Sequence, residues 1–127
     1  MYHLWYTPIV DKQPRQPILN VFFYRTDAGN EPVRAWLKSL SRDEKTIIGE
    51  DIKTAQFGWP LGMPLIRKLE RGLWEVRSTI RQGIARVLFT VDGSTMILLH
   101  GFVKKSQKTQ LADLNTARRR LADLQEE

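Results

Sequence analysis

Cysteine is absent from the sequence, and histidine occurs only twice among 127 residues. Without cysteine the chain has no disulfide bond, no thiolate nucleophile and no cysteine-based zinc site. His3 and His100 are too few for a metal cluster, so we expect neither a metal nor another cofactor. No apolar run is long enough to span a bilayer. A glycine-rich phosphate loop and a Ser–His–Asp signature are missing as well.

The first residues also lack the features of a secretory signal. Pro8, Asp11 and Pro14 interrupt the aromatic opening stretch, and no small-residue cleavage site follows. We therefore expect a cytoplasmic protein that does not contact a membrane. Prolines and polar residues predict an irregular arm over residues 1–17, and residues 18–127 have the length of one domain with a single core.

Positive charge is in excess over the whole chain. Twenty Lys and Arg residues against fourteen Asp and Glu residues give a formal net charge of +6 at pH 7. Such a balance favours polyanionic or acidic-protein partners through long-range attraction and counterion release. Composition alone leaves nucleic-acid binding open, because many basic proteins bind none.

Local signals in the first half predict a strand followed by two helices. Residues 19–25 are rich in β-branched and aromatic residues, which favours a strand. Asn30 is expected to cap a helix that has Pro32 in its first turn. Ser41 and Glu44 have the spacing of a capping box for a second helix. We expect the two helices to form a hairpin.

The second half has the pattern of short strands and one final helix. Four strands are predicted over residues 65–69, 73–80, 84–91 and 95–103. Short turns between successive strands predict an antiparallel meander. An amphipathic helix over 109–127 is expected to pack through Leu111, Leu114, Ala117, Leu121 and Leu124. The fold class is thus α+β, a small antiparallel sheet against an N-terminal helical hairpin and a C-terminal helix, in the order β-α-α-β-β-β-β-α.

Alternation along the strands separates an apolar face from a polar face. Glu75 and Arg77 lie opposite the apolar residues of their strand, which should meet the helices. Arg86 lies opposite the apolar set of the next strand, so it should join Arg77, and Lys104 follows at the end of the last strand. We expect these cations to converge on a solvent-facing hollow that fits a bent RNA phosphate.

A basic cluster of this kind is able to cleave RNA without a metal. Attack by the neighbouring 2′-hydroxyl needs an aligned phosphate, neutralisation of its growing charge, and proton transfer. Losing one well-aimed electrostatic donor costs about 10²–10³ in rate, and a proton-transfer group contributes about 10²–10⁴. Charge stabilisation therefore accounts for much of the acceleration that such a site needs.

Two stretches carry a resemblance to a known family. They read LIRKLERGLWEVRSTIRQGIARVLFTV and MILLHGFVKKSQKTQLADLNTARRRLAD. Together they resemble the HigB-like, phage-derived branch of the RelE/ParE toxin superfamily, and the similarity runs from Asn20 to the C-terminus. The resemblance implies a small antiparallel sheet packed against helices and the toxin of a type II toxin–antitoxin pair that cleaves messenger RNA on the ribosome. It also implies a cognate helix-turn-helix antitoxin of the HigA type and an oligomeric complex.

The resemblance also assigns site residues. Nuclease members place basic active-site residues at the positions of Arg77, Arg86 and Lys104. We expect Arg86 to stabilise the scissile phosphate, Arg77 and Lys104 to position it, and Arg86→Ala to lose activity without loss of fold. Glu75 departs from the pattern, because some nucleases have a basic residue there. Proton transfer is left to His100, Glu75 or a lysine, and a structural role for His100 is the alternative.

Lys68, Lys105 and Lys108 are candidate RNA-binding residues. An ordinary solvated loop is the alternative for the last two. Arg86 has the alternative of a solvated strand residue, and Arg77 that of an ion pair with Glu75. Two rival functions share the same fold: a non-enzymatic toxin of the ParE type that binds DNA gyrase, and an inactive phage-derived protein that binds only its antitoxin or nucleic acid.

Overall fold

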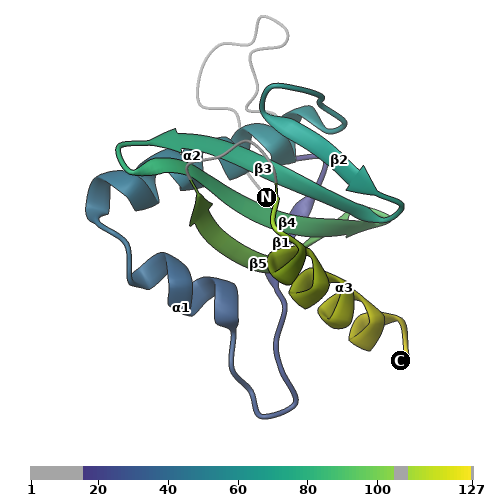
Figure 1. Ribbon diagram of the computed structural model, residues 1–127. Helices are drawn as coiled ribbons and strands as arrows, with labels where there is room; N and C mark the ends of the chain where they lie inside the picture. The colour runs from purple at the N-terminus through teal and green to yellow at the C-terminus, as the bar shows by residue number, and fades with distance from the viewer. Residues whose placement is uncertain (1–15, 105–108, 127) are drawn as a thin grey trace, which may run out of the picture.

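The computed structural model describes residues 16–104 and 109–126, and this part of the chain forms a five-stranded sheet with three helices (Figure 1). The elements are β1 (Asn20–Phe23), α1 (Pro32–Lys38), α2 (Arg42–Gly58), β2 (Ile66–Glu70), β3 (Leu73–Ile80), β4 (Gly83–Asp92), β5 (Thr95–Lys104) and α3 (Leu111–Gln125). The predicted α+β class and the predicted order β-α-α-β-β-β-β-α are confirmed.

The strands lie in the order β1-β5-β4-β3-β2. Strands β2 to β5 form the antiparallel meander that the turn signals predict. Strand β1 instead pairs in parallel with β5, from Asn20 opposite Thr95 to Phe23 opposite Leu98. The sheet is therefore mixed and not wholly antiparallel. The long connection through α1 and α2 sets the direction of β1, and no tight turn constrains it.

The start of α2 follows the predicted capping chemistry, whereas the start of α1 does not. Ser41 Oγ accepts a hydrogen bond from the Glu44 backbone N–H at 3.2 Å, and Glu44 Oε1 accepts from the Ser41 N–H at 3.0 Å, so the capping box of α2 is confirmed. The expected cap at Asn30 is wrong, because the N-cap of α1 is Glu31. Pro32 takes the first helical position, which needs no backbone N–H and moves the cap next to it.

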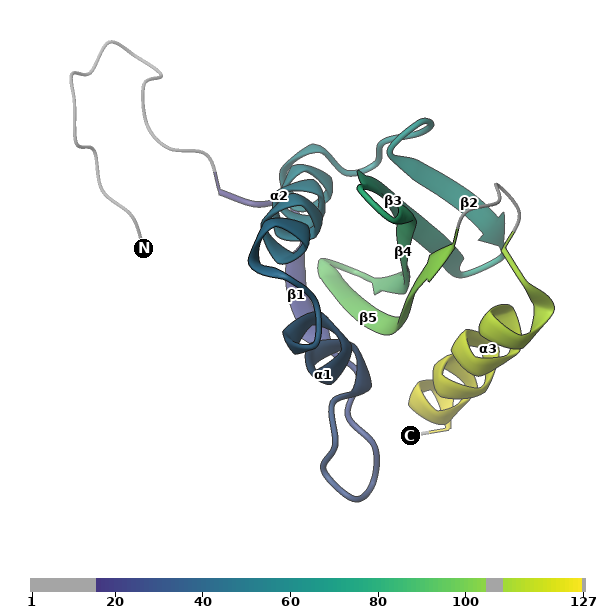
Figure 2. The same cartoon turned by 60° about the vertical axis from the view of Figure 1, so that its left-hand side comes forward.

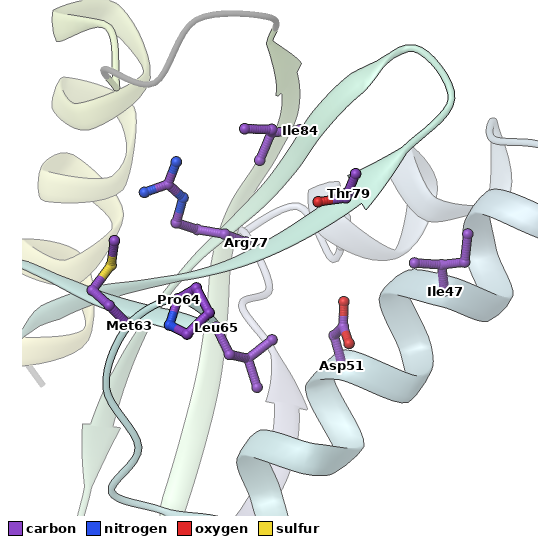
Figure 3. A pocket seen from close by; sticks show the side chains of 8 residues that line it. All are labelled: Ile47, Asp51, Met63, Pro64, Leu65, Arg77, Thr79 and Ile84. Carbon is purple, nitrogen blue, oxygen red and sulfur yellow. The ribbon is translucent and has the colours of Figure 1, made fainter.

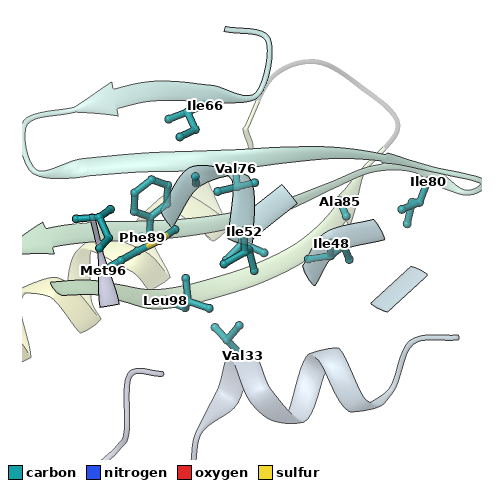
Figure 4. Packing of buried hydrophobic residues seen from close by; sticks show 13 residues of the cluster. Val33, Ile48, Ile52, Ile66, Val76, Ile80, Ala85, Phe89, Met96 and Leu98 are labelled. Carbon is teal, nitrogen blue, oxygen red and sulfur yellow. The ribbon is translucent and has the colours of Figure 1, made fainter. Parts of the chain in front are cut away.

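Helices α1 and α2 cover one face of the sheet, and α3 covers the other (Figure 2). The predicted helix pair is present, with α1 packed on β5 and α2 packed on β3. Between this pair and the sheet lies the main apolar core (Figure 4). Its members include Val33, Ile48, Ile52, Ala55, Ile66, Val76, Val87, Phe89, Met96 and Leu98.

A second, smaller apolar cluster lies under α3. Buried Leu73, Leu88, Leu99 and Ala117 belong to it, and three leucines of α3, Leu114, Leu121 and Leu124, pack against it. Leu111 was expected in this stripe, but it is 65% exposed. At 3.6 residues per turn it falls at the solvent edge of the stripe, whereas Asp113 falls at the opposite edge, beside the sheet.

The described ranges, 16–104 and 109–126, contain no helix with both the length and the apolar character that crossing a membrane requires. Most of the predicted arm over 1–17 lies outside the described residues.

Candidate functional site

Strand register gathers the five predicted catalytic residues on the sheet face that α3 covers. Arg77 pairs with Arg86 across β3 and β4, and Arg86 pairs with Phe102 across β4 and β5. Leu88 of β4 pairs with Glu75 on one side and with His100 on the other. Directly paired residues point to the same side of a sheet, so these side chains share one face. We call this the charged face.

Arg86 is at the centre of a buried polar network. Its side chain is 0% exposed, and its Nη1 lies 3.9 Å from Glu75 Oε2. The same Nη1 donates to Thr109 Oγ1 at 3.2 Å, and the Thr109 hydroxyl donates to Glu75 Oε1 at 2.8 Å. The network therefore ties β3 and β4 to the residue that leads into α3.

The expectation of a solvent-facing hollow around Arg86 is wrong. Both Arg86 and Glu75 are fully buried, because α3 packs over the face that alternation alone leaves open. Burial lowers the pKa of the Arg86 guanidinium, whereas the Glu75 carboxylate opposes this shift. Arginine titrates so far above neutrality that Arg86 stays charged, and its pairing with Glu75 offsets part of the desolvation.

Arg77 lies between this network and an open pocket. Its side chain is 9% exposed, and its Nε is 3.9 Å from Glu75 Oε2, so the predicted ion pair is present. Arg77 also lines a pocket of about 500 Å³ with Leu65 from the segment before β2 and Asp51 from α2. Figure 3 shows the Arg77 guanidinium pointing away from Asp51. Through this pocket Arg77 is reachable from solvent.

Lys104 lies one row beyond Arg86 on the neighbouring strand. It pairs with Ile84, two residues before Arg86, so Lys104 and Arg86 are diagonal neighbours, which are about 7–8 Å apart in a sheet. Lys104 also lines a pocket of about 420 Å³ with Arg81 and Gln82 of the β3–β4 turn. The structure therefore brings Lys104 to the charged face.

Of the three lysines predicted to bind RNA, one is described, and it lies elsewhere. Lys68 pairs with Trp74, and its Nζ is 5.7 Å from the centre of the Trp74 ring, on the side of the main core. The neighbouring Arg67 pairs with Glu75 instead and so belongs to the charged face. Lys105 and Lys108 lie outside the described residues.

The sequence alone does not assign Arg67 to the site, because the short strand β2 has apolar residues on both faces of the sheet. Ile66 packs in the main core, whereas Leu69 packs in the cluster under α3 after a register shift between Lys68 and Glu70. Alternation along β2 alone thus gives no face for Arg67, and only its pairing with β3 does.

His100 makes a short contact with α3. Its Nε2 lies 2.8 Å from Asp113 Oδ1, and both side chains are 20% exposed. The imidazole also stacks on Phe102, with ring centres 5.5 Å apart and an angle of 26° between the planes. Asp113 was missed in the sequence. The available signal was an acidic residue beside the apolar stripe of the last helix.

The charged face thus offers two kinds of chemistry. Arg67, Arg77, Arg86 and Lys104 supply positive charge for a phosphate, and His100 supplies an imidazole, a side chain able to accept or donate a proton. Among residues 16–104 and 109–126, no group of three or more His, Cys, Asp or Glu side chains is arranged to hold a metal ion.

A helix pair on one side of a five-stranded mixed sheet, with one helix over a charged face, makes the chain a small α+β domain. The family model described as Phage derived protein Gp49-like (DUF891) matches residues 35–122. The chain belongs to this family, which is part of the RelE/ParE-like toxin superfamily. A search of curated proteins finds no match to the chain.

Proposed function

We propose that the chain is a HigB-like toxin of a type II toxin–antitoxin pair and that it cleaves messenger RNA on the ribosome without a metal. The observation that carries the proposal is the shared position of Arg77, Lys104 and His100 on one sheet face, around the buried Arg86. Membership of the Gp49-like family supports the toxin part of the proposal.

Arg77 and Lys104 hold the scissile phosphate in this proposal. Both line pockets at the rim of the charged face, where an RNA backbone has access. A guanidinium binds two phosphoryl oxygens at once, and an ammonium adds a compact charge. Each such donor contributes about 10²–10³ in rate when it is aimed at the charge that develops on the phosphate.

Arg86 and Glu75 act as positioning residues in the described arrangement, because neither is exposed. Glu75 lies within 3.9 Å of Arg77 Nε and so helps to orient that guanidinium. Arg86 adds a positive charge beneath the phosphate site. Proton transfer falls to His100, which is exposed in part and lies in the next row of the same face.

The proposed partner is a helix-turn-helix antitoxin of the HigA type, bound in an oligomeric complex. Superfamily membership and the net charge of +6 support an acidic protein partner as well as the ribosome and its message.

Arg77→Gln tests the nuclease directly. In a purified translation system with a defined message, we expect cleavage about 10²–10³-fold slower than wild type with an unchanged circular-dichroism spectrum, because the side chain reaches the pocket. Lys104→Ala should act in the same direction. Lys53→Ala, an exposed cation on α2, is the matched control and should cleave like wild type. Full activity of both Arg77→Gln and Lys104→Ala contradicts the proposal.

The burial of Arg86 and Glu75 favours one rival, a toxin of the ParE type that binds gyrase without chemistry. In that case the network is purely structural, and the basic face is incidental. Induced cells separate the two functions: early transcript cleavage supports the nuclease, and DNA damage with intact transcripts supports gyrase binding. Retained antitoxin binding without any toxicity identifies an inactive phage-derived protein.

A further inference from the structure

The contact between His100 and Asp113 fixes the chemistry of one imidazole. A carboxylate only accepts hydrogen bonds, so at 2.8 Å the neutral ring must carry its proton on Nε2. The lone pair is then on Nδ1, which is the nitrogen left to accept a proton. Stacking on Phe102 limits rotation of the imidazole about the Cβ–Cγ bond of His100. One acidic residue of α3 therefore selects the tautomer of a β5 histidine.

The pair lies beside the proposed phosphate site. His100 and Arg86 are diagonal neighbours across β5 and β4, because Phe102, two residues after His100, pairs with Arg86. The charge of Asp113 also reaches Arg86, where it raises the pKa of the guanidinium slightly against the lowering by burial. The imidazole therefore lies one row from the buried Arg86, and it shares a sheet face with Arg77 and Lys104, the cations that would hold a phosphate. A proton acceptor for a bound 2′-hydroxyl has to lie on that face.

We propose that Asp113 is a positioning residue for RNA cleavage and that it acts by holding His100 with Nδ1 unprotonated. The inference rests on the proposed function. Nδ1 takes the proton of the 2′-hydroxyl while O2′ forms a bond to phosphorus and the bond from phosphorus to O5′ breaks. The products are a 2′,3′-cyclic phosphate and a 5′-hydroxyl. The leaving O5′ takes a proton from water, and the imidazolium returns its proton to the hydroxide so formed.

The same helix provides a matched control. Asp123 accepts a hydrogen bond from the Tyr24 hydroxyl at 2.7 Å, which also ties α3 to the rest of the domain. It is the same residue type with a contact of nearly the same length, but it lies ten positions further along the helix. A role that merely fastens α3 to the sheet predicts similar effects for the two aspartates, whereas a role in positioning His100 predicts different ones.

The first measurement is the single-turnover rate at which the protein cleaves a defined message that is bound to ribosomes. Asp113→Ala should cleave about 10²-fold more slowly than wild type or worse, since a misplaced proton acceptor loses most of its contribution of about 10²–10⁴. Asp123→Ala should cleave at the wild-type rate. Asp113→Asn, which keeps the size of the side chain, provides the same comparison if the alanine variant does not fold. The amide of the Asp113→Asn variant can either donate a hydrogen bond to Nε2 or accept one from it, so this variant does not select one tautomer.

The second measurement does not depend on activity. With only two histidines in the chain, His3→Gln assigns the imidazole nitrogen resonances of His100. In the wild type these should report the Nε2–H tautomer, and in Asp113→Ala or Asp113→Asn a mixture.

Wild-type cleavage rates in both Asp113 variants, or His100 resonances that do not respond to them, overturn the inference alone. A wild-type chain that cleaves no message overturns the proposed function and the catalytic role together, while the resonances still establish whether Asp113 selects the tautomer.

Discussion

Gly101 lies within β5 on the side of the main core, with the indole ring of Trp36 where a side chain would begin. A Cβ at position 101 would overlap the six-membered part of that ring. The contact lets α1 approach β5 closely, so the glycine is required by packing and not by its backbone angles.

Gly101→Ala should destabilise the domain by about 1–3 kcal/mol, because Trp36 must turn away to make room. Urea unfolding measures the loss. Gly49→Ala is the matched control: a Cβ there meets nothing within 4 Å, and alanine in a helix interior is expected to add about 0.5–1 kcal/mol. If Gly101→Ala is as stable as wild type, the ring of Trp36 is free to move and the packing argument fails.

At the scale of elements, the start of α2 is joined to the sheet through Glu44. The Ser41 backbone N–H, which donates to this carboxylate, lowers the pKa of Glu44, and desolvation opposes the shift. Gln82 of the β3–β4 turn donates to the other oxygen at 2.6 Å and lowers the pKa further. One carboxylate therefore caps a helix and holds a distant turn.

This arrangement predicts a pH dependence of stability. A lowered pKa means that the folded chain binds the proton less tightly than the unfolded chain, so the stabilisation is complete above the ordinary carboxyl pKa and is lost as the pH falls through the folded value. Between neutral pH and about pH 3, the Tm of wild type should fall more steeply than that of Glu44→Gln, which keeps the shape without the charge. Equal slopes contradict the prediction.

At the scale of the whole molecule, the two sheet faces differ in kind. The face under α1 and α2 is apolar, whereas the face under α3 combines a small apolar cluster with a buried network of charges. Arg86, Glu75 and Thr109 join β4, β3 and the entry to α3, so the network stabilises the whole assembly as well as the proposed site.

Arg86→Ala is therefore expected to destabilise the domain by about 3–5 kcal/mol, because it breaks a fully buried ion pair and leaves Glu75 with Arg77 as its neighbouring cation. Because Arg86 is fully buried, a loss of activity in Arg86→Ala is expected to come with a loss of stability. Arg86→Met combined with Glu75→Leu should recover part of the stability in urea unfolding, since apolar side chains replace a buried ion pair at little cost, although Arg77 loses its contact with Glu75. The double variant should still cleave message more slowly than wild type. An alanine variant as stable as wild type shows that the network contributes little to folding.

Much of the fold was predictable because its signals are local. Turn residues such as Gly72 and Gly93, which have positive φ angles of 77° and 61°, mark where strands reverse. The spacing of Ser41 and Glu44 marks the start of α2. Alternation along β3 and β4 alone predicts that Glu75, Arg77 and Arg86 share one face, and the strand register confirms it.

The site was only partly predictable, because its contacts join residues that are far apart in the chain. Whether Arg67 or Lys68 joins the cluster depends on the pairing of β2 with β3. The burial of Arg86 depends on a helix that begins 25 residues later, at Leu111. Asp113 meets His100 only because that helix folds back over the sheet.

The sequence by itself determined the order of the elements, the turns and the face on which the residues of β3 and β4 lie, because these follow from the geometry of neighbouring residues. Only the tertiary structure decided which face is covered, which cations remain accessible and which acid meets the histidine. Those properties arise from strand register and from the packing of α3, which no local pattern encodes.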